Sequence, residues 1–182
     1  MEKKDLILNL KQKAKELRKE IITMVYNAQS GHTGGSLSAI DMLVGLYYYK
    51  LRIEPKNPMW QDRDRFVLSK GHCSPAIYVV LADKDYFPKS ELDGYRKIGR
   101  MLQGHPELST PGIDFAGGAL GQGISFAVGI ALACRLDKKN CNVYAMIGDG
   151  ETQEGAVWEA SMAAAFYKLD NLIVVLDKNQ VQ

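Results

Sequence analysis

The chain alternates long stretches of helical apolar periodicity with three short runs that are mostly apolar. The short runs predict buried β-strands at residues 65–68, 142–147 and 172–176. The periodic stretches predict helices at residues 5–29, 39–50, 75–82, 89–96, 124–136 and 155–168. Strands separated by helices favour an α/β fold, in which a parallel sheet carries helices on both of its faces.

Two stretches carry more specific expectations. Residues 30–38 hold three glycines, so we expect a loop there, with Ser38 capping a helix that begins at Ala39. Residues 155–168 are apolar nearly all round the predicted helix, which predicts that this helix is buried.

The last two strands enclose the stretch with the most distinctive chemistry. Gly148-Asp149-Gly150 follows the strand at 142–147, and Asn179 follows the next strand, 30 positions beyond Asp149. A crossover between parallel strands brings both side chains to the carboxyl edge of the sheet, where α/β proteins bind ligands. A carboxylate and an amide oxygen suit magnesium and a diphosphate, and the glycines allow a tight turn whose amides can face an anion. The tripeptide alone is an ordinary turn; its place between a strand and a helix makes it informative.

Composition restricts the class of protein. With 182 residues, 46% hydrophobic and 24% charged, the chain is long enough for one domain, residues 1–182, with a substantial core. A net charge of +2 favours neither a nucleic acid nor a membrane surface as partner. No run approaches the roughly 20 apolar residues of a membrane span, and the charged N-terminus is unlike a signal peptide. Three cysteines without metal-ligand spacing, Cys73, Cys134 and Cys141, predict reduced thiols and a cytoplasmic location.

The three histidines, His32, His72 and His105, each follow a glycine in a predicted loop. Any one of them could make only a local hydrogen bond, but the shared context favours a common site. Zinc is a competing interpretation, although separations of 40 and 33 residues match no local ligand motif. We interpret them as hydrogen-bond donors and proton carriers around an anionic, hydroxyl-rich ligand.

These stretches resemble a known family when they are taken in order. The Gly148-Asp149-Gly150 turn and Asn179 look like the thiamine-diphosphate fingerprint. Four further motifs precede them in the order found in the N-terminal, diphosphate-binding domain of transketolase: Ser30-Gly31-His32-Thr33-Gly34, Asp64 through His72, Gly104-His105-Pro106-Glu107 and Leu120-Gly121-Gln122-Gly123. The resemblance covers nearly the whole chain from about Leu17, and is close to the N-terminal subunit of split transketolases.

The resemblance implies roles for individual residues. Magnesium would be held by Asp149, Asn179 and the backbone carbonyl of Val181. Thiamine diphosphate would be contacted by His72, Gly150, Gly118 and Leu120, as well as by Asp149 and Asn179. His32 and His105 would bond the hydroxyls of the donor sugar and assist proton transfer. Glu154 would lie at a subunit interface and link to the glutamate that activates the neighbouring cofactor; its plainer interpretation is a carboxylate favoured in the first turn of a helix.

The implied reaction moves a two-carbon glycolaldehyde unit from a ketose phosphate to an aldose phosphate. Thr33 and Ala119 stand where the family often has proline, which changes loop stiffness rather than chemistry. Other thiamine-diphosphate reactions stay open, such as deoxyxylulose phosphate synthesis, a 2-oxoacid dehydrogenase component or transfer from a variant donor. So does a non-catalytic scaffolding subunit. A nucleotide-binding Rossmann domain is disfavoured because no Gly-x-Gly-x-x-Gly follows a strand with an acidic partner downstream.

The resemblance also implies partners. The groups that protonate the aminopyrimidine and bind the sugar phosphate belong to the family's other domains. We therefore expect half of a composite active site, completed by a C-terminal transketolase subunit or by C-terminal domains beyond Gln182. A homodimer or heterotetramer is expected, with sugar phosphates as substrates.

Overall fold

The computed structural model describes residues 3–180, which form two compact units. The helical unit comprises Met1–Pro58, His72–His105 and Thr110–Gly112. The sheet unit comprises Met59–Gly71, Pro106–Ser109 and Ile113–Gln182. Each unit is described by itself below.

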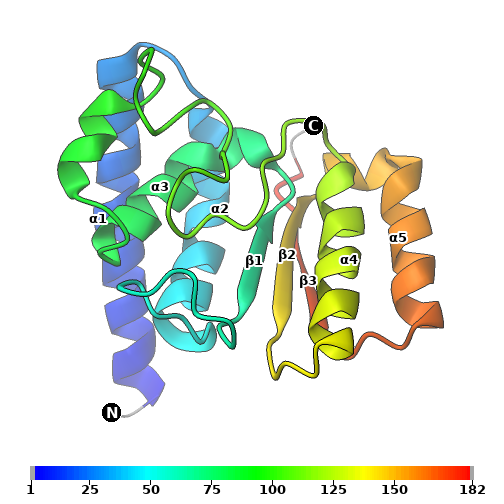
Figure 1. The fold of residues 1–182 in the computed structure, drawn as a ribbon. Helices are drawn as coiled ribbons and strands as arrows, with labels where there is room; N and C mark the ends of the chain where they lie inside the picture. The colour runs from blue at the N-terminus through cyan, green and yellow to red at the C-terminus, as the bar shows by residue number, and fades with distance from the viewer. Residues whose placement is uncertain (1–2, 181–182) are drawn as a thin grey trace. The chain divides into compact units, whose positions relative to one another are not determined.

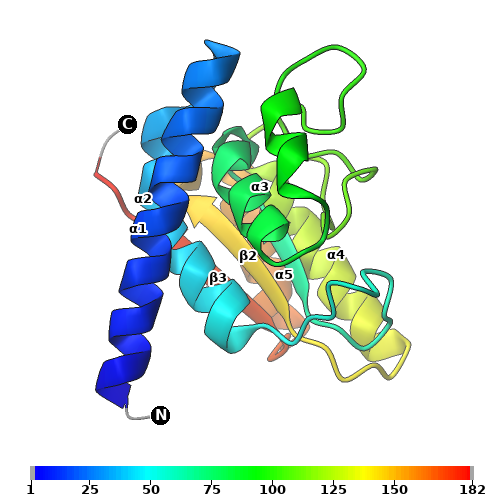
Figure 2. The same cartoon turned by 90° about the vertical axis from the view of Figure 1, so that its left-hand side faces the viewer.

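The helical unit is built on the long helix α1 (Lys3–Ala28), which packs against α2 (Thr33–Gly45) and α3 (Ser74–Asp83). Figure 2 shows α1 running alongside α2. The apolar stripe of α1 explains this contact, because its buried positions recur at helical spacing: Ala14, Leu17, Ile21 and Met24. A π-helical turn, η1 (Leu46–Lys50), extends α2, and a 3-10 turn, η2 (Gly71–Cys73), leads into α3. The predicted surface helix at 89–96 is a shorter 3-10 segment, η3 (Lys89–Gly94).

Helix α2 begins earlier than the sequence predicts. It starts at Thr33, and His32 rather than Ser38 occupies the capping position. The predicted loop is wrong from Thr33 onward, because Gly35 allows a close contact between a helix and a neighbouring segment and does not form a turn. An ideal Cβ on Gly35 would lie 2.8 Å from the sulfur of Cys73 and 3.1 Å from Nε2 of His72. Glycine therefore lets the first turn of α2 lie directly against His72.

The sheet unit contains three parallel strands in the order β1 (Arg65–Leu68), β2 (Val143–Gly148) and β3 (Leu172–Asp177). All six residues of the central strand β2 are buried, as its unbroken apolar sequence predicts. Helices α4 (Gln122–Leu136) and α5 (Gly155–Phe166) lie side by side next to the sheet, and α4 contacts all three strands (Figure 1). A 3-10 turn, η4 (Gly150–Gln153), connects β2 to α5. The expected α/β class and parallel strand pairing are confirmed.

The predicted burial of the helix at 155–168 is wrong. Only Val157 and Ala160 of α5 are buried, and both belong to the core formed with α4 and β2. Trp158, Met162 and Phe166 are 62%, 66% and 78% exposed. Because they recur every four residues, they form a continuous apolar stripe along the outer face of α5. The sequence shows that this helix is apolar all round but does not show how much of it this chain covers.

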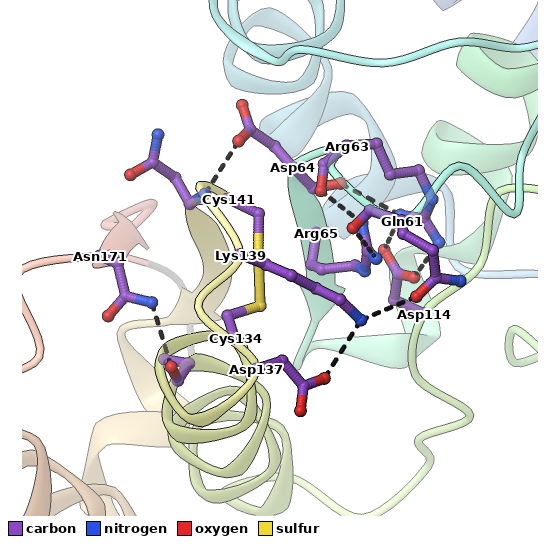
Figure 3. Close-up of a disulfide and its surroundings, with 12 residues drawn as sticks. Gln61, Arg63, Asp64, Arg65, Asp114, Cys134, Asp137, Lys139, Cys141 and Asn171 are labelled. Carbon is purple, nitrogen blue, oxygen red and sulfur yellow. Dashed lines mark hydrogen bonds and ion pairs between the residues drawn. A yellow bond between two sulfur atoms is a disulfide. The ribbon is translucent and has the colours of Figure 1, made fainter.

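Two cysteines also differ from expectation. Cys134 at the end of α4 and Cys141 before β2 are joined as a disulfide, with Cα atoms 6.5 Å apart (Figure 3). Lys139, between them, pairs with Asp137 and donates a hydrogen bond to Gln61. Nearby, Arg63 and Asp114 form a half-buried ion pair, and Asp114 also accepts a hydrogen bond from the N–H of Phe66 in β1. The prediction of reduced thiols is therefore wrong for Cys134 and Cys141, whereas Cys73 is a buried thiol.

No helix in the described residues, 3–180, is long and apolar enough to cross a membrane.

Candidate cofactor and metal site

The turn after β2 presents Asp149 at the carboxyl edge of the sheet. Asp149 occupies the capping position of η4, and its Oδ1 accepts a hydrogen bond of 3.1 Å from the backbone N–H of Gly150. Its Oδ2 accepts one of 2.8 Å from the N–H of Gln180, which lies just beyond β3. The Asp149 N–H in turn donates to the carbonyl of Asp177, 3.2 Å away. The ends of β2 and β3 are thus tied together at the predicted ligand-binding edge.

The same contacts set the charge of Asp149. The N–H of Gln180 is the main influence that lowers its pKa, with further lowering from the N–H of Gly150 and from the positive charge of Lys70; desolvation opposes them. Asp149 is therefore ionised at neutral pH. Two oxygens carry roughly four acceptor sites, so this carboxylate retains capacity for a cation beyond its two backbone contacts.

The residues present are compatible with a magnesium site. Asn179 lies between the end of β3 and Gln180, which bonds Asp149. Val181 lies outside the described residues. Among residues 3–180 no group of three His, Cys, Asp or Glu side chains is arranged to hold a metal. The predicted donors, one carboxylate, one amide oxygen and one backbone carbonyl, are oxygen donors of the kind that magnesium accepts, and they stay a prediction.

A glycine-rich loop reaches the same turn from the start of α4. Gly121 precedes this helix with a φ of +83°, a conformation that side chains other than glycine rarely adopt. An ideal Cβ on Gly121 would also lie 2.7 Å from the Cβ of Glu154, so Glu154 packs directly on this loop. Gly118 and Leu120, earlier in the loop, are exposed. The structure therefore places Glu154 beside the loop that was predicted to face the cofactor.

Two buried side chains close to this turn, those of Lys70 and Glu151, make polar contacts with neighbouring segments. Lys70, two residues after the end of β1, pairs with Asp177 at the end of β3, and their side chains are only 2% and 5% exposed. Glu151, 2% exposed, accepts hydrogen bonds from the Ser69 hydroxyl, from Gly121 N–H at 2.7 Å and from Gly148 N–H at 3.1 Å. These contacts connect the ends of all three strands.

The helical unit brings the three histidines together. The ring centroids of His32 and His72 are 5.5 Å apart, and those of His32 and His105 are 6.4 Å apart. His32 and His105 are exposed, whereas His72 is half-buried against Gly35. The structure therefore brings the three rings close together, and the roles predicted for these histidines stay predictions.

The surroundings of His105 favour its neutral imidazole form. Burial lowers the pKa of His105, and the positive charges of His32 and Arg96 lower it further. A neutral imidazole can both accept and donate a hydrogen bond, as proton transfer to and from a hydroxyl requires.

Sequence reasoning missed Lys70, Glu151 and Asp177 as members of this site. A signal existed for Lys70 and Asp177, because these charged residues lie at or within two residues of the end of an apolar strand. A charge that is buried at such a position must find a partner. Glu151 had no comparable signal, since an acidic residue in the first turn after a strand is common.

Comparison with known proteins matches this arrangement to one family. The sequence pattern described as "Transketolase, thiamine diphosphate binding domain" matches residues 10–182. The chain belongs to the transketolase family. The crystal structure of transketolase from Campylobacter jejuni superposes with a TM-score of 0.91 at 39% identity, covering 95% of this chain and 28% of that one.

Relatives that are themselves single components of split transketolases share more of their length with this chain. One component of the apulose-4-phosphate transketolase of Phocaeicola vulgatus is 44% identical over 165 residues, covering 91% of this chain and 59% of that protein. The SqwG component of the 6-deoxy-6-sulfo-D-fructose transketolase of Clostridium sp. is 46% identical over 176 residues, covering 96% and 64%. The chain thus spans about six tenths of the split-enzyme components it matches and carries a transketolase thiamine-diphosphate-binding domain.

Proposed function

We propose that this chain contributes the diphosphate- and magnesium-binding half of an enzyme that moves a two-carbon glycolaldehyde unit from a ketose phosphate to an aldose phosphate. The observation that carries the proposal is Asp149, an ionised carboxylate at the carboxyl edge of a parallel sheet, bonded to Gln180 from the end of the next strand. In a thiamine-diphosphate-binding domain of the transketolase family, such a carboxylate would serve to hold magnesium and the diphosphate.

In this proposal residues 1–182 act as a single binding domain. Asp149, Asn179 and the carbonyl of Val181 hold magnesium, and the N–H of Gly150, His72 and the backbone of Gly118 and Leu120 orient the cofactor. Bound thiamine diphosphate would supply the nucleophilic carbon and the electron sink needed to cleave a carbon–carbon bond. The protein's own contribution is to bind, to orient and to move protons.

Proton movement falls to the histidines. His105 is held neutral at physiological pH, so it can accept a proton from a sugar hydroxyl and return it. His32, whose ring lies 6.4 Å from that of His105, would bond a neighbouring hydroxyl of the same sugar. Glu154, packed on Gly121, is proposed to carry the link to a second active site across a subunit interface.

Assay of the natural assembly tests the proposal. The tagged chain is purified from its own cells with any partner and supplied with thiamine diphosphate, magnesium, xylulose 5-phosphate and ribose 5-phosphate. Formation of sedoheptulose 7-phosphate is expected, and Asp149→Ala should abolish both magnesium-dependent cofactor binding and product. Asp93→Ala, an exposed aspartate on η3, is the matched control and should leave both unchanged.

Two results would contradict the proposal. Full activity of Asp149→Ala would favour a scaffolding subunit, because a scaffold still assembles without the metal ligand. Ketol transfer by the purified chain without a partner or further domains would show that the site is not a composite one.

We propose that the partner covers the apolar stripe of α5. A large exposed apolar surface on a protein of this size commonly marks an interaction site. The stripe comprises Trp158, Met162 and Phe166, and belongs to the helix that follows Glu154. A C-terminal subunit or further domains, in a homodimer or heterotetramer, would complete the active site; light scattering of the native assembly measures its stoichiometry.

A variant donor is a second candidate function. Two relatives above 40% identity are named for transfer from apulose 4-phosphate and from 6-deoxy-6-sulfo-D-fructose. Testing both donors against xylulose 5-phosphate in the same assay separates the candidates. The donor with the highest kcat/KM decides whether the chain serves the pentose phosphate pathway.

We further propose a cytoplasmic location, since sugar phosphates are charged and do not cross membranes unaided. The Cys134–Cys141 disulfide is unusual for such a location, because disulfides are rare in reducing compartments. Fractionation of the source cells tests the location: recovery of the chain in the cytoplasmic fraction is expected, and recovery outside it would contradict the proposal.

A further inference from the structure

Glu151 is a buried carboxylate that no role so far described uses. It follows Gly150 directly and is 2% exposed, yet it makes no ion pair among the described residues. Instead it accepts three hydrogen bonds: Oε1 from the Ser69 hydroxyl and from Gly121 N–H at 2.7 Å, and Oε2 from Gly148 N–H at 3.1 Å. A buried carboxylate is costly unless donors surround it, and here donors converge on both oxygens.

The three donors come from three separate segments. Ser69 directly follows β1, Gly121 ends the glycine-rich loop before α4, and Gly148 ends β2. Gly121 adjoins Leu120, a predicted cofactor contact, and Gly148 adjoins Asp149, the predicted metal ligand. One side chain therefore joins the loop that would face the cofactor rings to the turn that would hold the metal.

The segments around Glu151 are closely packed against one another. An ideal Cβ on Gly123 would lie 2.5 Å from Oγ of Ser69 and 2.6 Å from its Cα, so the first turn of α4 rests directly on the end of β1. Ser69 is itself fully buried. With those backbones in contact, the position of the Gly121 loop relative to the Gly148 turn depends on the carboxylate between them.

We propose that Glu151 is a positioning residue, which fixes the spacing between the glycine-rich loop and the metal-binding turn and thereby sets the affinity for the magnesium–diphosphate group. The inference rests on the proposed function. It predicts that loss of one hydrogen bond loosens one segment selectively rather than the whole unit.

The Glu151→Gln variant tests the two carboxylate oxygens of Glu151 separately. Glutamine keeps one oxygen, which can still accept from Ser69 and Gly121, but it presents an NH₂ group to the Gly148 N–H, where two donors then face each other. Amide exchange followed by mass spectrometry should show Gly148 exchanging about tenfold faster or more, with Gly121 little changed. Glu151→Ala should release both amides. Glu159→Gln, an exposed glutamate on α5, is the matched control.

Cofactor binding by the native assembly provides the functional measurement. Glu151→Gln should raise the Kd for thiamine diphosphate with magnesium about tenfold or more, leave the KM of the donor sugar within about twofold, and recover kcat at saturating cofactor. General loss of structure would instead lower the active fraction without this split. Ser69→Ala, which removes one donor and leaves both amides, should give a smaller rise in the same Kd, and it carries the test if Glu151→Gln does not fold.

The failures are distinguishable. A wild-type assembly that binds no thiamine diphosphate overturns the proposed function, and this inference with it. A wild type that binds the cofactor, beside a folded Glu151→Gln variant with unchanged Kd or unchanged Gly148 exchange, overturns the inference alone. If Ser69→Ala carries the test, an unchanged Kd for thiamine diphosphate with magnesium overturns the inference.

Discussion

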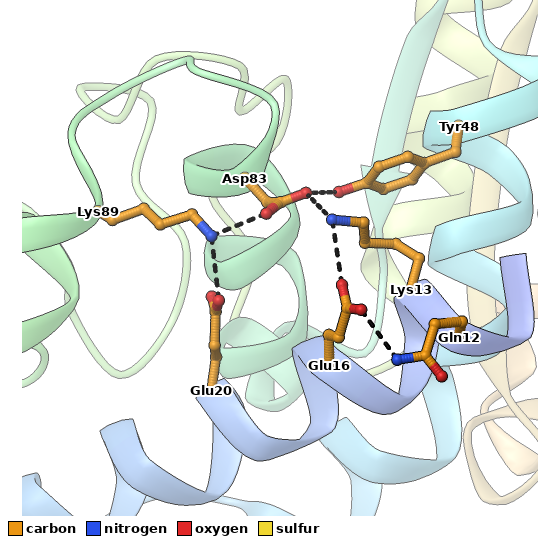
Figure 4. A network of polar contacts seen from close by, with 7 residues as sticks. All are labelled: Gln12, Lys13, Glu16, Glu20, Tyr48, Asp83 and Lys89. Carbon is orange, nitrogen blue, oxygen red and sulfur yellow. Dashed lines mark hydrogen bonds and ion pairs between the residues drawn. The ribbon is translucent and has the colours of Figure 1, made fainter. Parts of the chain in front are cut away.

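Two carboxylates in this protein each accept hydrogen bonds from three groups, and they lie in very different surroundings. Asp83, at the end of α3, accepts from Lys13, Tyr48 and Lys89 at the surface of the helical unit (Figure 4). Glu151 accepts from one hydroxyl and two backbone amides in the interior of the sheet unit. Asp83 is surrounded by long polar side chains, two of them charged, whereas the donors to Glu151 are fixed by strands and a helix start.

The difference shows where polar contacts can define geometry. Partners on long exposed side chains can reorient into water, so their loss costs little. Partners that are buried and belong to the backbone cannot, so the position of each segment depends on the contact. The exposed network around Asp83 therefore contributes little to stability, whereas the buried contacts of the sheet unit contribute more and fix the geometry of the candidate site.

The largest effect is expected when the buried pair Lys70–Asp177 is broken. Lys70→Met leaves the Asp177 carboxylate buried without its cation, which should lower the free energy of unfolding by about 3–5 kcal/mol. Urea unfolding followed by circular dichroism measures it. The double variant Lys70→Met/Asp177→Leu should recover much of the loss. A single variant as stable as wild type would show that the pair is dispensable.

A smaller loss is expected from Gly123→Ala. Its added methyl would meet the backbone of Ser69 at 2.6 Å, which should cost about 1–3 kcal/mol of unfolding free energy. Gly129→Ala, in the same helix with nothing within 4 Å, is the matched control and should stabilise by up to about 1 kcal/mol. Equal effects at the two positions would contradict the close approach.

The surface network should show its contribution through pH. Burial raises the pKa of Asp83, but hydrogen bonds from Lys89, Tyr48 and Lys13 outweigh it and bring the value down to about 2. Because the pKa of Asp83 is lower in the folded state than the ordinary value of 3.8, the ionised carboxylate stabilises the fold at pH values above 3.8. This contribution to stability is lost as the pH falls from about 4 to about 2. Asp83→Asn should therefore destabilise by about 1 kcal/mol at pH 6 and by much less at pH 2. A pH-independent difference would contradict the role of the charge.

The smallest effect is expected from Lys89→Met. Lys89 is 52% exposed while it bridges Asp83 and Glu20, so its removal should cost no more than about 0.5 kcal/mol. Unfolding at low salt and at roughly tenfold higher salt provides the check, because screening should erase even that difference. A larger, salt-insensitive loss would place this network in the same class as the buried pair.

Much of the fold and of the candidate site is readable from the sequence. Strands were predictable because their runs are mostly apolar, and Asp149 was identifiable because a strand precedes it and a helix follows. The start of α2 was not predictable, because Gly35 looks like a loop residue in the sequence. Its role is a close contact with His72, which lies far away along the chain. Nor was the exposure of α5 predictable, because a sequence that is apolar all round the helix does not show how much of the helix the rest of the chain covers. The junction at Glu151 likewise depends on long-range packing.

The apolar stripe of α5 gives the protein an intrinsic optical probe. The indole N–H of Trp158 donates a 2.8 Å hydrogen bond to the carbonyl of Thr152, whose hydroxyl in turn donates to the carbonyl of Asp149. The exposed ring is thus connected through two bonds to the residue proposed to bind magnesium. The only other tryptophan is Trp60, so Trp60→Phe leaves a single emitter. Its fluorescence can report on the turn without an attached label, as ions are titrated in or as a partner covers the helix.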